Sequence, residues 1–119
     1  MVNIRKINGL MKATDLRVGN YYYWNEEPEC KGDVYQISDT YSLYSIDEHF
    51  FYFEPIPLTE EWLLKFGFKK IGNRYGNGHK RKVILNKQFY HSIAGYIKYV
   101  HQLQNLYFAL TQTELEYDL

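Results

Sequence analysis

The residues whose types could carry chemistry are few and stand apart from one another. Asp47, Glu48 and His49 are adjacent, but neighbours in a polar turn rarely converge on one point, so we expect an exposed turn rather than an acid–base or metal site. His91 and His101 fall on different expected elements. No serine or cysteine has a recognisable nucleophile context. The sequence therefore predicts no catalytic residue, and we expect a protein that is not an enzyme.

Glycines at positions 72, 76 and 78 precede Lys80 and resemble a phosphate loop at first sight. The P-loop pattern requires glycine directly before the lysine and serine or threonine directly after it. His79 and Arg81 occupy those two positions. The pair Asn77-Gly78 is instead a strong signal for a β-hairpin. We therefore expect a hairpin connection over residues 75–81.

Cysteine and histidine content indicates neither a disulfide nor a metal. Cys30 is the one cysteine, which excludes an internal disulfide and fits a reducing cytoplasm. The four histidines are scattered, so we expect no zinc site, no other metal and no cofactor. No apolar run approaches the roughly 20 residues needed to span a bilayer. The sequence predicts a cytoplasmic protein that does not enter a membrane.

A formal net charge of zero conceals two halves of opposite sign. Residues 1–58 carry five Lys/Arg and nine Asp/Glu, whereas residues 59–119 carry nine and five. No Asp or Glu occurs from Trp62 to Thr113, and all nine bases of the second half fall within residues 65–98. This segment could bind phosphates, with tyrosines as stacking faces. It could equally be a solvated surface, or a basic face that docks on the acidic half.

The nucleic-acid-binding interpretation rests on bases interspersed with an aromatic residue around the expected hairpin. The candidate residues are Lys69, Lys70, Arg74, Tyr75, Lys80, Arg81 and Lys82.

A second candidate surface is aromatic. Tyr21, Tyr22 and Tyr23 are consecutive beside Trp24, and side chains alternate along a strand, so at least one tyrosine must face away from the buried side. Exposed tyrosine and tryptophan are typical of binding hot spots, although strands can also bury aromatics on both faces. A polar face expected on the second helix suits a protein contact as well. The protein-binding candidates are Tyr21, Tyr22, Tyr23, Trp24, His101, Gln102 and Asn105.

The sequence PIPLTEEWLLKFGF predicts a central helix at about 59–66. The elements around this helix must position the candidate binding residues. Thr59 is placed to cap its first turn, and Gly67 suits the left-handed residue that ends it. Leu58 and Leu63 have the spacing of a hydrophobic staple. Trp62, Leu63 and Phe66 share one face, which we expect to be core.

The pattern on either side of this helix predicts one α+β domain over residues 11–119, with residues 1–10 as a flexible extension. In the half that spans 11–58, expected strands at 21–24, 34–38, 41–46 and 50–53 form an SH3-like antiparallel meander. In the half that spans 59–119, expected strands at 69–74, 82–86, 89–91 and 95–99 form a second small antiparallel sheet. A C-terminal helix at about 100–110 closes the chain and packs with the first helix.

Three stretches, DLRVGNYYYW, PIPLTEEWLLKFGF and YIKYVHQLQNLYFALTQTEL, resemble a family of small uncharacterised proteins of phages, prophages and other mobile elements. The family pattern has glycine near position 112, where this chain has Gln112. The resemblance implies a phage or mobile-element origin and a bacterial cytoplasm, with no known activity. We therefore expect an accessory module that binds an unidentified host or phage protein and interferes with a host system; the alternative is a nucleic-acid-binding protein that uses residues 65–98.

Overall fold

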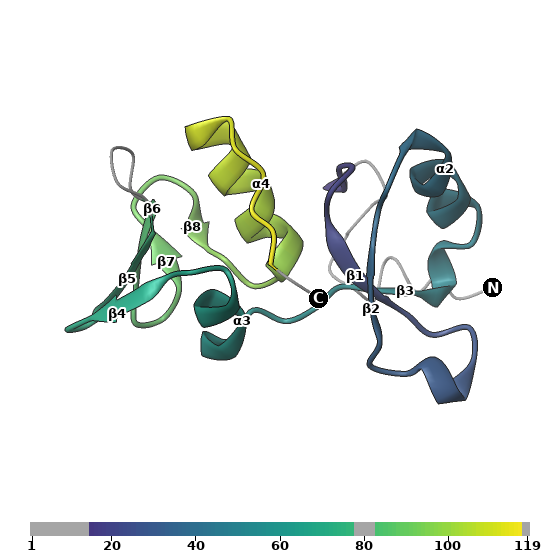
Figure 1. Cartoon of the computed structure of the whole chain (residues 1–119), viewed down its shortest axis with the longest axis horizontal. Helices are drawn as coiled ribbons and strands as arrows, with labels where there is room; N and C mark the ends of the chain where they lie inside the picture. The colour runs from purple at the N-terminus through teal and green to yellow at the C-terminus, as the bar shows by residue number, and fades with distance from the viewer. Residues whose placement is uncertain (1–14, 78–82, 118–119) are drawn as a thin grey trace. The chain divides into compact units, whose positions relative to one another are not determined.

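The computed structural model describes residues 15–77 and 83–117 of the chain. These residues form two compact units divided after Ile56, close to the boundary after residue 58 that the sequence suggested. The expected extension over residues 1–10 lies outside the described residues. Both units combine short antiparallel strands with helices, which confirms the α+β class (Figure 1).

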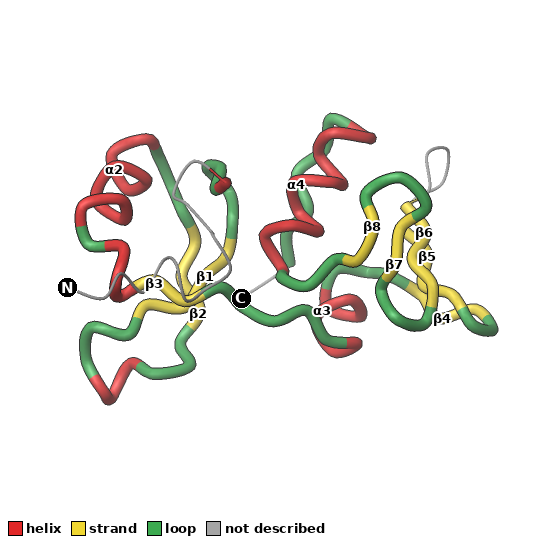
Figure 2. The backbone as a smooth tube through the Cα atoms, turned by 180° about the vertical axis from the view of Figure 1, so that it is seen from behind, coloured by secondary structure: helices red, strands yellow, loops and turns green. Residues whose placement is uncertain are grey.

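The first unit is built on a three-stranded antiparallel sheet of order β2-β1-β3. Its strands are β1 (Tyr21–Trp24), β2 (Val34–Gln36) and β3 (Phe53–Glu54). Figure 2 shows the three strands side by side, with helix α2 (Thr40–Glu48) beside them. Two short 3₁₀ helices, η2 (Pro28–Cys30) and η3 (Phe50–Tyr52), lie in the connections.

Strand pairing places four aromatic side chains on one face of this sheet. Tyr22 pairs with Tyr35 and Trp24 pairs with Phe53 across the strands. Because successive side chains point to opposite faces, these four rings lie on the face opposite to Tyr21 and Tyr23. The central position of β1 in the sheet thus brings together aromatics that are distant in sequence.

Helix α2 corrects the prediction of a strand over residues 41–46. Asp39 caps the helix, since its carboxylate accepts a hydrogen bond from the backbone N–H of Ser42 at 2.7 Å. Leu43 and Ile46 are three residues apart; Leu43 is half-buried and Ile46 is buried. The two-residue spacing of Tyr41 and Leu43 suggested a strand, whereas the three-residue spacing of Leu43 and Ile46 fits the helix.

The expected meander of four strands is therefore wrong. The 3₁₀ helix η3 also takes the place of most of the expected strand over residues 50–53. Strand pairing begins only at Phe53. The SH3-like identity of this half stays a prediction.

In the second unit, helix α3 (Glu60–Lys65) confirms the expected central helix. The Thr59 hydroxyl accepts a hydrogen bond from the backbone N–H of Trp62 at 3.3 Å. At the other end Gly67 has φ +87°, and the Phe68 N–H donates to the carbonyl of Leu63 at 2.9 Å. This is the Schellman arrangement, which uses the conformational freedom of glycine to satisfy carbonyls at a helix end.

A second three-stranded antiparallel sheet has the order β4-β5-β6. Its strands are β4 (Lys69–Ile71), β5 (Arg74–Asn77) and β6 (Val83–Asn86). The expected single strand over 69–74 is broken, since a turn at Gly72 (φ +61°) separates β4 from β5. Asn77 pairs with Val83, so β5 and β6 are adjacent antiparallel strands. Residues 75–77, which we expected in the connection, belong to β5 instead, and residues 78–82 lie outside the described residues.

A small hairpin of β7 (Tyr90–His91) and β8 (Gly95–Tyr96) follows. The buried His91 stabilises its turn, because Nδ1 accepts hydrogen bonds from the backbone N–H groups of Ile93 and Ala94 at 3.1 and 3.2 Å. Cross-strand partners Tyr90 and Tyr96 are both exposed, with ring centroids 4.9 Å apart. This histidine has a structural role that its sequence context did not suggest.

Helix α4 (Val100–Thr111) confirms the expected C-terminal helix. The Gln102 carboxamide oxygen accepts hydrogen bonds from the backbone N–H groups of Lys98 and Tyr99 at 2.9 and 3.1 Å, which anchors the helix start. Gln112 ends the helix in the left-handed region at φ +61° and donates its N–H to the Phe108 carbonyl at 2.7 Å. Glutamine therefore occupies a position for which glycine is the favoured residue.

We expect Gln112→Gly to raise the free energy of unfolding by about 1 kcal/mol, because the left-handed conformation costs a residue with a Cβ roughly 1–2 kcal/mol and the greater freedom of unfolded glycine offsets part of the gain. Chemical denaturation monitored by circular dichroism measures the change. The matched control is Gln112→Ala, which keeps a Cβ. Equal stability of the glycine and alanine variants would contradict a strained helix end.

Candidate functional site

The first unit contains a pocket of about 410 Å³ between the sheet and helix α2. Strands β1 and β2, the loop after β1 and one side of α2 supply its walls. Its lining residues are Tyr22, Trp24, Glu26, Tyr35, Tyr41, Ser42, Ser45, Ile46 and His49. The site therefore depends on α2, which the sequence analysis interpreted as a strand.

Stacked rings form the sheet side of this pocket. The Tyr22 ring stacks on Tyr35 at 5.8 Å between centroids and on Phe53 at the same distance, and it meets Trp24 edge-on at 6.2 Å. Phe53 stacks in turn on Phe50 at 4.9 Å. The pocket wall is thus continuous with the aromatic core of the unit, which holds these rings in fixed orientations.

Polar groups occupy the edge of the pocket. The exposed Glu26 carboxylate accepts a hydrogen bond from the Trp24 indole N–H at 3.1 Å, which fixes a negative charge beside the ring. Burial raises the pKa of the Tyr22 hydroxyl above its ordinary value, so this group stays neutral at physiological pH. The pocket is therefore lined by aromatic rings next to a carboxylate.

The aromatic candidates from β1 separate into two groups. Tyr22 and Trp24 line the pocket and are half-buried. Tyr21 is only 2% exposed and belongs to the core, so its assignment to a binding surface is corrected by its burial. Tyr23 is half-buried on the opposite face of the sheet.

Sequence reasoning missed Tyr35 and Tyr41 as members of this site. Tyr35 is brought beside Tyr22 by strand register, and Tyr41 is brought to the pocket by helix α2. Tyr41 is 76% exposed, an unusual exposure for a large aromatic side chain. The capping aspartate at position 39, followed by Leu43 and Ile46 at helical spacing, is the signal that could have revealed the helix.

The candidate residues on α4 do not form the expected exposed polar face. His101 is 2% exposed, and its ring stacks on Tyr99 at 5.9 Å between centroids. Gln102 uses its carboxamide to cap the helix, and Asn105 is half-buried. Gln104 is fully buried and donates to the Leu115 carbonyl at 3.1 Å, which ties the C-terminal segment to the helix. The polar residues of α4 thus serve largely to hold the second unit together.

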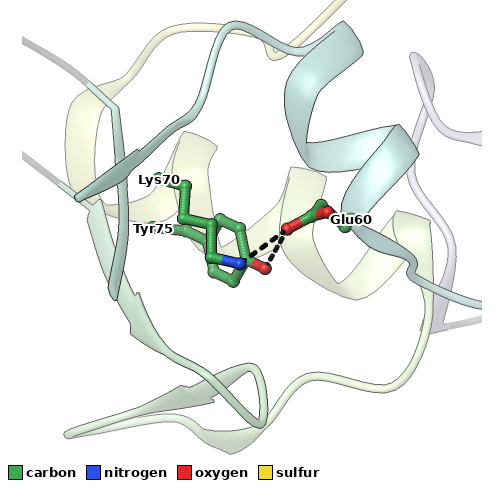
Figure 3. A network of polar contacts seen from close by, with 3 residues as sticks. All are labelled: Glu60, Lys70 and Tyr75. Carbon is green, nitrogen blue, oxygen red and sulfur yellow. Dashed lines mark hydrogen bonds and ion pairs between the residues drawn. The ribbon is translucent and has the colours of Figure 1, made fainter. Parts of the chain in front are cut away.

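Two of the nucleic-acid-binding candidates are engaged with an acid from α3. The Lys70 ammonium lies 3.5 Å from the Glu60 carboxylate, and the Tyr75 hydroxyl donates a hydrogen bond to the same carboxylate (Figure 3). Tyr75 is 5% exposed and contacts Phe89 edge-on. Tyr75 is therefore a core residue, and its assignment as a stacking face for a base is corrected by its burial.

Lys69 and Arg74 remain exposed on the face of the second sheet opposite to Lys70 and Tyr75. Exposed Ile71 and Ile84 lie on that same face. The remaining candidates, Lys80, Arg81 and Lys82, lie outside the described residues. Strand alternation has thus divided the basic segment between two faces.

The described residues also bear on metal binding and membrane insertion. Over residues 15–77 and 83–117, no group of three or more His, Cys, Asp or Glu side chains is placed to hold a metal ion. Within the same ranges, no helix has the length and apolar character required to cross a membrane.

Comparison with family models, curated proteins and solved structures found no match to this chain.

The Glu60 contacts predict an acid-sensitive contribution to stability. The Tyr75 hydrogen bond, followed by the positive charge of Lys70, lowers the pKa of the Glu60 carboxyl group in the folded protein. A lowered folded pKa gives stability that is present above the unfolded pKa and is lost as the pH falls through the folded value. We expect Glu60→Gln to lower the melting temperature at neutral pH and the difference from wild type to shrink on acidification.

Thermal melts from neutral to acidic pH measure this dependence, and Glu61→Gln, in the same helical turn, is the matched control. A difference between wild type and Glu60→Gln that stays constant across the acidic range would show that the carboxylate contacts do not contribute to folding.

Proposed function

We propose that this chain is a small non-enzymatic protein-binding module whose partner occupies the aromatic pocket of the first unit. The observation that carries the proposal is the gathering of Tyr22, Trp24, Tyr35 and Tyr41 around one pocket. Tyrosine and tryptophan supply large contact areas at a low cost in conformational entropy, and they dominate the hot spots of protein interfaces.

The size and surroundings of the pocket support the same proposal. Its volume of about 410 Å³ lies within the ordinary range of ligand pockets and suits an inserted side chain. Tyr44, one helical turn after Tyr41, is 61% exposed, and Phe51 is 50% exposed. Neither side chain lines the pocket, but both add exposed aromatic surface to the same unit, and tyrosine is enriched in the hot spots of interfaces.

The nature of the partner rests on the resemblance to small phage and mobile-element proteins. We propose a host or phage protein as the partner, with interference in a host system as the biological outcome.

Tyr41→Ala should abolish partner capture without unfolding the protein. Tyr41 is largely exposed, so its truncation removes little of the core, whereas Tyr22→Ala would also remove the stacking on Tyr35 and Phe53. We expect capture to weaken by at least about 30-fold, the effect of losing a hot spot. The measurement is affinity capture from bacterial lysate with quantitative mass spectrometry, followed by titration of the purified partner.

The control variant is Ile93→Ala, which removes a side chain that is 84% exposed in the second unit. A partner retained by Ile93→Ala and lost by Tyr41→Ala supports the pocket. Equal capture by wild type and Tyr41→Ala would refute it.

Nucleic-acid binding is the second candidate, and the observation that favours it is the exposed pair Lys69 and Arg74 in a stretch without acids. Such a surface would bind phosphates electrostatically, with an affinity that falls as salt rises. The outer face of the second sheet is the proposed contact, since Lys70 and Tyr75 are engaged with Glu60.

Fluorescence anisotropy with single- and double-stranded DNA and RNA tests this candidate. If it is correct, Lys69→Glu combined with Arg74→Glu should eliminate binding that wild type shows at low salt. The charge-matched control reverses Lys31 and Arg17 in the first unit. Absence of binding by wild type at low salt would remove nucleic acid from consideration.

A further inference from the structure

The chemistry of the aromatic pocket indicates which kind of side chain it takes, an inference that rests on the proposed function. Its walls present four aromatic rings. The face of an aromatic ring carries partial negative charge and attracts cations, tryptophan most strongly. The edge of the pocket carries the Glu26 carboxylate, held next to the Trp24 ring by the indole hydrogen bond. Ring faces and a carboxylate at one site favour a positively charged group.

The chain around the pocket is negatively charged, as is the Glu26 carboxylate. Residues 15–56 carry nine Asp/Glu and two Lys/Arg. Asp47 and Glu48 lie on α2, the helix that forms one pocket wall, and both are exposed. An acidic surface raises the local concentration of cationic partners and repels phosphates and acidic peptides. Charge complementarity therefore selects a basic segment as the occupant.

The two positively charged side chains differ in how well they suit such a pocket. The guanidinium group of arginine is planar, weakly hydrated and able to stack on an aromatic face while it donates hydrogen bonds to a carboxylate. The ammonium group of lysine is compact and strongly hydrated, so removing its water shell costs more. The Trp24 ring beside Glu26 offers both contacts that a guanidinium can make at once.

We propose that the pocket binds an arginine side chain on a basic segment of the partner protein. The guanidinium enters the pocket lined by Tyr22, Trp24, Tyr35 and Tyr41, stacks on the Trp24 ring and donates to Glu26.

The two tryptophans permit a direct test in the whole chain. Trp24 lies at the pocket, whereas Trp62 is a core residue of the second unit. In a ¹H–¹⁵N NMR spectrum, the indole N–H signal of Trp24 therefore reports binding at the pocket, and that of Trp62 serves as an internal control. The probes are short glycine–serine peptides with arginine at alternate positions, and matched peptides with citrulline, lysine or glutamate there. Citrulline keeps the shape of arginine and lacks its charge.

We expect the arginine peptide to shift the Trp24 signal in a saturable way while the Trp62 signal stays in place. The citrulline peptide should bind at least about 10-fold more weakly, since it loses the charge that the rings and the carboxylate recognise. Equal binding of the citrulline, lysine or glutamate peptide would overturn the proposal, as would a Trp24 signal that the arginine peptide does not move.

Glu26→Gln tests the carboxylate, because it keeps the shape of the side chain and removes its charge. We expect it to weaken arginine-peptide binding several-fold. Asp33→Asn removes the same charge from an exposed position that does not line the pocket, and we expect little change. Equal effects of the two variants would show general attraction to an acidic surface and would overturn the assignment. If Glu26→Gln fails to fold, the peptide series on wild type decides the matter.

This test and the capture experiment can fail separately. A partner whose capture depends on Tyr41, together with a Trp24 signal insensitive to the arginine peptide, refutes arginine as the occupant and leaves the protein-binding function standing. Specific arginine-peptide binding without any Tyr41-dependent partner refutes the protein-binding function and supports the assigned chemistry of the pocket.

Discussion

The pairing of β1 with both of its neighbours is the constraint on which the candidate site depends. Because β1 is central, its register fixes Tyr22 opposite Tyr35 and Trp24 opposite Phe53. If the pairing of β1 shifted by one residue, Tyr21 and Tyr23 would move to the pocket side of the sheet. Tyr21 would then leave its buried position. The stacking of Tyr22 on both flanking rings and the burial of Tyr21 favour the same register, so core packing and pocket formation reinforce each other.

The second unit shows how a run of like charges is arranged when few acids lie nearby. Strand alternation sends Lys69 and Arg74 to one face and Lys70 to the other, where Glu60 of α3 lies. Lys65 instead lies over the rings of Trp62 and Tyr117, at 4.8 and 5.3 Å from their centroids. Lys65 and Lys70 of the basic segment therefore make contacts within the unit. These contacts argue against one continuous phosphate-binding surface.

Prediction from sequence succeeded where local signals agreed with each other. Thr59, Gly67 and the apolar stripe between them all indicated one short helix, and the structure confirms it. The prediction of a strand over residues 41–46 was wrong, because Tyr41 and Leu43 have the spacing of a strand while Leu43 and Ile46 have the spacing of a helix. The cap supplied by Asp39 and the burial of Ile46 favour the helix, and burial depends on residues remote in the chain.

The sequence by itself determined the α+β class, the helix after Thr59, the C-terminal helix and the opposite charge of the two halves, because caps, glycines, periodicity and charge are local properties. Only the tertiary structure decided that Tyr35 and Tyr41 join Tyr22 and Trp24 around a pocket, and that Tyr21, Tyr75 and His101 are core. Alternation shows that neighbouring side chains point to opposite sides of a strand. Which side is covered depends on the elements that pack there, and the local pattern of residues along one strand does not reveal those elements.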